Sequence, residues 1–174
     1  MSHAEGTRTK AIGANAHSEG YETEAGGNRS HAEGQGKAYG EVSHAEGRGT
    51  TGIKTETTDE TGNVTVTYSG GTYAHAEGDG TIASGYASHA GGKYTVAGHD
   101  SQTAIGRFNN NKEDTLFEVG NGTSDTERSN AFEVYKDGKG YLGNSEIATM
   151  DNLIAYGTMD DMNNSIAKFF VVIE

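Results

Sequence analysis

Small and polar residues recur along most of this chain in short blocks separated by a fixed interval. The block Ser-His-Ala-Glu-Gly or a close variant occurs six times, starting at Ser2, Ala16, Ser30, Ser43, Ala74 and Ser88. The histidines of these blocks lie 14, 14, 13, 31 and 14 residues apart. Such regular spacing is typical of repeat proteins, in which each repeat is one structural unit stacked on the next.

A second motif, Ala-x-Gly, follows half a repeat later, for example at Ala11-Ile12-Gly13 and Ala104-Ile105-Gly106. Seven residues suit a strand of about five residues plus a tight turn, so two such units make one coil. Because side chains alternate across a strand, Ser, Ala and Gly of the block face one side, while His and Glu face the other. The small side chains fit the inside of a thin roll, and glycine suits its corners. The pattern therefore predicts a mainly β protein, a parallel β-solenoid of roughly six coils and about 30 Å in length.

One coil is longer than the others. The step between the fourth and fifth histidines is 31 residues, which is 17 more than in a regular coil. Within it, residues 53–57 and 64–68 alternate and are rich in β-branched side chains, and residues 59–63 have turn chemistry. We therefore expect a projecting β-hairpin at about 53–69, and insertions of this kind often form the binding face of a solenoid. The candidate binding residues of this hairpin are Thr57, Asp59, Asn63 and Tyr68.

The chain changes character after the last repeat, so we divide it into a roll at 1–106 and two further segments. Residues 107–144 contain alternating apolar stretches separated by turn sequences, which predict a small β-domain. In residues 145–174 apolar residues recur at intervals of three to four, which predicts short C-terminal helices. Their apolar stripes could form a trimeric bundle or pack onto the β-domain. The apolar run at 169–173 is an alternative closing strand.

Composition removes several classes of protein. The chain has 174 residues, no Cys, Pro or Trp, and a net charge of −12. Without cysteine it has no disulfide framework, no thiolate metal site and no cysteine nucleophile. The negative charge opposes binding to a phosphate backbone, and no apolar run reaches the ~20 residues that span a bilayer. We expect no nucleic-acid partner and no membrane insertion.

The repeats resemble the heads of trimeric autotransporter (YadA-like) adhesins, and their His-Ala-Glu-Gly form is similar to head-like arrays in phage and prophage tail fibre proteins. Residues 116–123 and 128–134 resemble the β-domain that often follows such arrays in phage tail proteins. Together the two patches cover roughly residues 2–143. The resemblance implies a left-handed parallel β-roll in a homotrimer. The family usually has Val or Ile where His and Glu stand here, so its packing does not carry over to those positions.

Stacked coils place the histidines and glutamates of successive repeats in rows with a spacing of about 5 Å. The members of this ladder are His3, Glu5, His17, Glu19, His31, Glu33, His44, Glu46, His75, Glu77 and His89. We interpret the ladder as a structural hydrogen-bonded network between coils or protomers. Metal binding by symmetry-related histidines and catalysis by His–Glu pairs are the alternatives. Because a repeated motif makes a ladder and not one convergent pocket, we assign no catalytic residue, no metal and no other cofactor.

These observations favour a non-enzymatic, trimeric segment of a phage tail fibre, located in the virion. It would be structural and would contact a host cell-surface glycan or protein receptor. The first alternative is the head of a bacterial trimeric autotransporter adhesin at the cell surface. The second is a glycan-degrading or self-cleaving tail protein. A glycan-degrading enzyme needs paired carboxylates at a fixed separation, and no pair in the sequence stands apart from the repeat.

Overall fold

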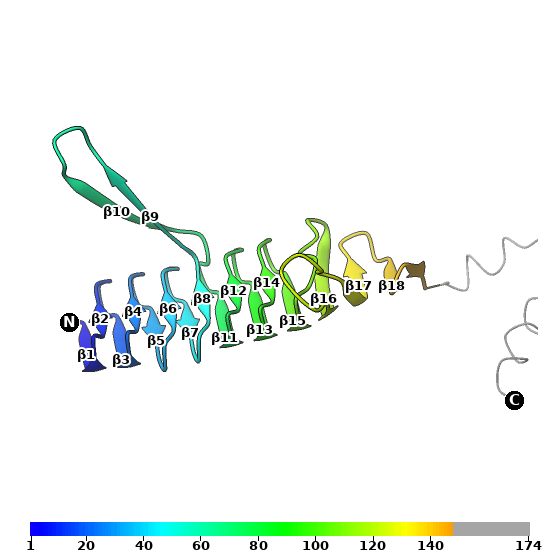
Figure 1. Ribbon diagram of the computed structural model, residues 1–174, viewed down its shortest axis with the longest axis horizontal. Coiled ribbons are helices and arrows are strands. Elements are labelled where there is room, and N and C mark those ends of the chain that lie inside the picture. Colours follow the sequence, from blue (N-terminus) through cyan, green and yellow to red (C-terminus); the bar gives the residue numbers. More distant parts are fainter. Residues whose placement is uncertain (148–174) are drawn as a thin grey trace, which may run out of the picture.

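The computed structural model describes residues 1–147, which form a β-solenoid of about 8 turns (Figure 1). Each regular coil contributes one strand to sheet A and one short strand to sheet B, and both run across the long axis of the roll. The described residues contain no helix, and so none long and apolar enough to cross a membrane. The solenoid predicted from the repeat period is therefore confirmed.

Sheet A has 11 strands, of which the first eight in spatial order are parallel and the last three antiparallel. In spatial order they are β1 (His3–Thr7), β3 (His17–Tyr21), β5 (His31–Ala32), β7 (His44–Ala45), β11 (His75–Asp79), β13 (His89–Lys93), β15 (Thr103–Arg107), β16 (Thr115–Asn121), β17 (Asn130–Tyr135), β18 (Gly140–Leu142) and β19 (Ser145–Glu146).

Sheet B has six strands, and its pairs have the same coil-to-coil register. They are β2 (Lys10–Ala11), β4 (Glu24–Ala25), β6 (Lys37–Ala38), β8 (Thr50–Thr51), β12 (Ile82–Ala83) and β14 (Val96–Ala97). The 14-residue step explains this register, because it returns each residue to the same position one coil further along the axis.

The apolar part of the core between the two sheets consists of alanine, and buried serine and threonine side chains such as Ser18 and Thr51 complete it. The fully buried alanines are Ala25, Ala32, Ala38, Ala45, Ala76, Ala83, Ala90, Ala97 and Ala104. The alternation of the strands places them inside and the histidines and glutamates outside, as the sequence pattern predicts. The small core brings the two sheets close together, and the inward position of the parallel strands before β16 holds only alanine, serine or threonine.

Glycine at the corners allows successive coils to approach each other closely. Gly20, the penultimate residue of β3, has a φ of +113°, a conformation that L-residues with a side chain rarely adopt. Gly85 has no such φ, but a Cβ atom there would overlap the carbonyl oxygen of His99 in the next coil. Corner glycines therefore serve both chain direction and coil spacing.

The solenoid has more coils than the histidines mark. Strands β15 and β16 continue the parallel part of sheet A, with Thr103 and Phe117 in register with His89. Parallel pairing does not require the histidine, and in β15 the inward Ala104 and Gly106 match the alanine and glycine of the earlier coils. The expected count of roughly six coils was too low because it relied on the histidines alone.

The parallel stack ends at a buried carboxylate. Glu118 in β16 points inward, where earlier coils have alanine, and it is fully buried. It accepts hydrogen bonds from the backbone amides of Asn111 (3.0 Å) and Lys112 (2.7 Å) and from the Thr115 hydroxyl (2.8 Å). This arrangement lets the loop before β16 close the end of the alanine core, and we call it the C-terminal cap.

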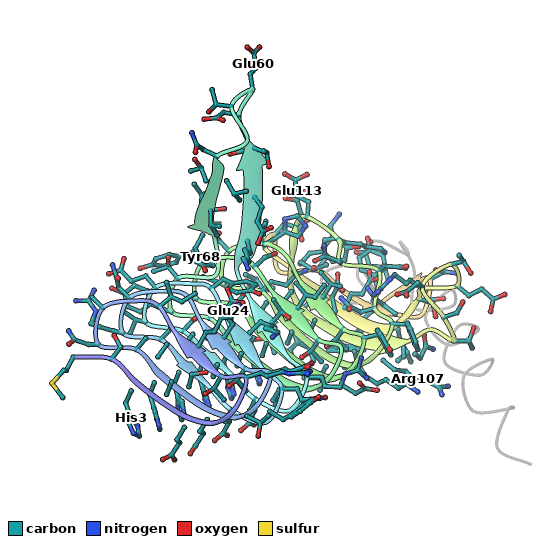
Figure 2. The ribbon with its side chains drawn as sticks, turned by 60° about the vertical axis from the view of Figure 1, so that its left-hand side comes forward. His3, Glu24, Glu60, Tyr68, Arg107 and Glu113 are labelled. Atoms are coloured by element: carbon teal, nitrogen blue, oxygen red, sulfur yellow. The ribbon has the colours of Figure 1, made fainter. Side chains whose placement is uncertain are left out.

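The inserted segment forms the predicted hairpin. Strands β9 (Ile53–Thr58) and β10 (Val64–Ser69) pair antiparallel and follow β8 directly. The hairpin projects away from the roll on the side of sheet B and leans over the N-terminal coils (Figure 1). Glu60 lies at its tip, while His3 lies on the opposite side of the roll (Figure 2).

The C-terminal part differs from the sequence expectation in one respect. Ser145 and Glu146 form β19, which pairs with β18, whereas the sequence predicted that a helix begins there. Gly143, with a φ of +60°, supplies the tight turn between the two strands, and this local turn chemistry decides the conformation of Ser145. Residues 107–144 join the same continuous sheet as the roll. The rest of the predicted helical segment, 148–174, lies outside the described residues.

Candidate functional site

The six repeat histidines form one continuous stack along the outer face of sheet A. His3, His17, His31, His44, His75 and His89 pair in exact register. Neighbouring ring centroids lie 4.8 to 5.2 Å apart, and the ring planes differ by 9° to 23°. The stack spans the long insertion, because β7 pairs directly with β11.

The glutamates form a second row beside the histidines. Each lies two residues after its histidine on the same face of the strand, and Glu5 and Glu19 are direct partners in the register. The row comprises Glu5, Glu19, Glu33, Glu46 and Glu77. Its first four members, with the glycines that follow each block, line a shallow open groove. Gly91 stands opposite Glu77 in the next coil, so the row ends there.

The two rows meet between coils. The Nε2 atom of His31 lies 3.6 Å from an oxygen of Glu19 in the preceding coil, and that of His44 lies 3.7 Å from Glu33. The same distance is 3.9 Å for His75 and Glu46, and 3.5 Å for His89 and Glu77. These distances exceed those of N–H···O hydrogen bonds. Within a single chain, then, the described residues do not make the hydrogen-bonded His–Glu network that the sequence led us to expect.

The close spacing changes the acid–base behaviour of the rows. Burial lowers the pKa of His44 and of His75, and neighbouring imidazoles lower it further. Sharing of a proton with Glu33, and next with Glu77, raises the pKa of Glu46 to about 7, while the pKa of Glu33 is lowered. The row therefore holds fewer negative charges near neutral pH than its five carboxyl groups would carry if they were independent.

The four candidate residues of the hairpin fall into two places. Thr57, Asp59 and Asn63 are exposed in its outer half. There Asp59 accepts hydrogen bonds from the amides of Thr61 and Asn63, both at 2.9 Å, so its carboxylate organises the turn. Tyr68 is separate from these, at the base of the hairpin (Figure 2). The structure thus brings Asp59 and Asn63 together but does not place Tyr68 with them.

Tyr68 anchors the hairpin to the roll. Its hydroxyl donates a 2.9 Å hydrogen bond to Glu24 in β4, and its ring stacks on Tyr39 with centroids 5.3 Å apart. The Nζ atom of Lys54 in β9 lies 3.1 Å from Glu24 Oε1, the same oxygen that accepts the Tyr68 hydrogen bond. Burial, and then the bond to Glu24, raises the pKa of Tyr68 to about 12. Sequence reasoning missed Glu24, because nothing in the repeat indicates which distant side chains the insertion will cover.

Comparison of the chain with protein-family models, with curated proteins and with solved structures gives no match.

Proposed function

We propose that this chain is a non-enzymatic segment of a phage tail fibre that acts as a trimeric rod and contacts the host surface. The observation that carries the proposal is the shape of the molecule: a straight stack of coils with one exposed hairpin projecting from its side (Figure 1). A stack of this kind supplies length and direction, and a projecting insertion supplies a surface for recognition. The resemblance of the repeats to head-like arrays in tail fibre proteins also supports this proposal.

Exposed apolar side chains support assembly into a homotrimer. Val42 and Tyr73 occupy the same corner position in successive coils, and the Tyr73 ring packs edge-on against Tyr86, with centroids 5.4 Å apart. Tyr73 and Tyr86 are 54% and 51% exposed in the single chain. An alanine core buries little apolar area, so covering such side chains by association would add stabilisation that one chain lacks.

The hairpin is the proposed contact with a cell-surface glycan or protein receptor. Its strands carry exposed threonines and the apolar side chains Ile53, Val64 and Val66, all of which are more than 40% exposed. An exposed surface of mixed hydroxyl and apolar groups on a projecting arm suits contact with another macromolecule. The roll fixes this arm in direction through Tyr68 and Lys54.

The test is binding of the purified chain to host cells. A variant with residues 53–69 replaced by a short Gly-Ser linker should lose most cell binding, while a variant with Glu113→Ala on the exposed loop before β16 should keep it. Circular dichroism and native mass must show that both variants retain the β-solenoid and the assembly state of the parent. Equal binding by the linker variant and the parent would remove the hairpin from the proposed function.

A further inference from the structure

The face of the roll that carries the histidines brings potential metal ligands together. Among residues 1–147 three groups each contain three such side chains. The groups are His17–Glu19–His31, His31–Glu33–His44 and Glu46–His75–Glu77. Within each group one ligand atom of every residue lies within 4.8 Å of the others. Because the members come from successive coils, the parallel register fixes their relative positions.

The His–Glu distances suit a bridging ion better than they suit a hydrogen bond. Two ligand atoms that each lie about 2.1 Å from a tetrahedral ion are about 3.4 Å apart. In the three groups, Nε2 of His31, His44 and His75 lies 3.6, 3.7 and 3.9 Å from its glutamate oxygen. Two ligands of each group are thus nearly in place, and the third must rotate about its side-chain bonds to complete the site.

The same nitrogens lack any other partner. Among the described residues, Nε2 of His17, His31, His44, His75 and His89 is buried and makes no hydrogen bond. Buried polar atoms in proteins nearly always have a partner, and an unbonded one calls for a water molecule or an ion. A metal ion between the rows would bond to the ladder nitrogens and also reduce repulsion among the carboxylates beside them.

The donor set identifies the class of metal. Imidazole nitrogen combined with carboxylate oxygen is the set that Zn²⁺ and its first-row neighbours prefer, whereas Ca²⁺ and Mg²⁺ take oxygen ligands. A net charge of −12 further raises the local concentration of cations around the chain.

We propose that the outer face of sheet A binds Zn²⁺ or a related divalent transition metal through Nε2 of the stacked histidines and the adjoining glutamates, with at most two ions per chain. The limit follows from His31, which belongs to the first two groups but can give its Nε2 atom to one ion only. One ion would therefore lie among residues 17–44 and the other among residues 46–77. This goes beyond the proposed attachment function and departs from our sequence-based assignment of no metal.

The test is titration of the untagged, metal-free chain with Zn²⁺, followed by calorimetry and by elemental analysis after desalting. The parent should bind two ions per chain with dissociation constants of about 10 μM or tighter. The variants His31→Gln and Glu77→Gln should each lose one ion, and the double variant should lose both. Titration with Co²⁺ should give the visible absorption of a tetrahedral site with nitrogen and oxygen ligands in the parent and not in the double variant.

Two further variants provide matched controls. His3 belongs to the same stack but has no glutamate in a preceding coil, and His99 lies outside the stack. The variants His3→Gln and His99→Gln should both bind two ions. The proposal is overturned if the parent binds no Zn²⁺ up to about 1 mM, if the double variant still binds both ions, or if the control variants lose as much binding as His31→Gln. Circular dichroism of every variant checks that the loss of a ligand, and not of the fold, is measured.

Discussion

The width of the roll is decided by single alanine side chains. Ala76, Ala90 and Ala104 lie one above another in sheet A and are fully buried between it and sheet B. With the sheets this close, a larger side chain at such a position has no cavity to enter and must push the sheets apart. The requirement for a small side chain at these buried positions is therefore the strictest one that the fold places on the sequence.

Replacement of Ala90 by leucine should destabilise the chain by about 3 kcal/mol, because overpacking forces backbone shifts in at least two coils. Thermal unfolding followed by circular dichroism measures the effect. Ala14→Leu is the matched control, since Ala14 is exposed at a corner and should change stability by less than about 0.5 kcal/mol. Equal effects at Ala90 and Ala14 would mean that the core has more room than the structure shows.

Alanine substitutions at two glycines distinguish the stability cost of a steric overlap between coils from the cost of a positive φ. Gly85→Ala should cost about 3 kcal/mol, since its Cβ would overlap the His99 carbonyl of the next coil. Gly62→Ala should cost only about 1 kcal/mol, because Gly62 in the hairpin turn has a φ of +84° but open space around it. Chemical denaturation of the two variants gives the comparison, and a larger loss at Gly62 would contradict it.

A single carboxylate organises each of two elements, the hairpin turn and the C-terminal cap. Asp59 is exposed and gathers the amides of its own turn, whereas Glu118 is buried and gathers amides from the loop that closes the core. Each carboxylate accepts hydrogen bonds from backbone amides, but removal of the exposed one and removal of the buried one should have different effects. Loss of the first affects a local element, and loss of the second affects the end of the whole stack.

The Asp59 turn should depend on pH in a defined direction. Hydrogen bonds from Thr61, and then from Asn63, lower the pKa of Asp59 to about 2, below its ordinary value of 3.8. A lowered pKa in the folded state means that the turn is fully stabilised above about pH 4 and loses this stabilisation as the pH falls through about 2. An NMR titration of the Asp59 carboxyl carbon, with the amides of Thr61 and Asn63 as reporters, measures it. A midpoint near 4 would show that these hydrogen bonds are absent in solution.

Removal of the cap carboxylate should be costly. Glu118→Ala leaves the backbone amides of Asn111 and Lys112 without their acceptor inside the protein, and we expect a loss of about 3 kcal/mol or more. Hydrogen exchange should show that β15 and β16 open first. Glu113→Ala, on the same loop but exposed, is the control and should be nearly neutral. If both variants were equally stable, the cap would contribute nothing to the end of the core.

The whole molecule depends on contacts between neighbouring coils and on its assembly state. The strands of sheets A and B pair only with those of adjacent coils along the stack, apart from the antiparallel strands at the end. We expect light scattering after size exclusion to give a native mass of about 55 kDa, three times the 18.2 kDa of the chain. A folded species at the mass of one chain would contradict the proposed trimer and leave Tyr73 and Tyr86 exposed to water.

How much of the structure follows from the sequence depends on the range of the interactions involved. The 14-residue period predicts the register, the inward alanines and the outward histidines, because one coil placed on the next determines all three. The hairpin follows from local alternation and turn chemistry. The coils that contain Thr103 and Phe117 were missed, because they lack the Ser-His-Ala-Glu-Gly block from which the coils were counted. Their strands pair in parallel without it.

The candidate site can be predicted only in part from the repeat period. The rows of His and Glu follow from the period, but their separation depends on side-chain positions in two different coils. Likewise, the buried contact of Glu24 with Tyr68 joins residues 44 positions apart and exists only once the hairpin leans back over β4. The sequence also did not predict that Glu118 points inward, because its hydrogen-bond partners come from a loop without any repeat pattern.

The direction of the hydrogen bonds between coils has a mechanical consequence. They run along the long axis, so a pull on the two ends of the chain peels the hydrogen bonds of an outermost coil one at a time, while each interface further inside shares the same force among all its bonds. Under tension the roll should give way one coil at a time, each release lengthening the chain by about 45 Å for 14 residues. A rod built in this way absorbs a sudden load in small repeated steps and does not fail as a single body.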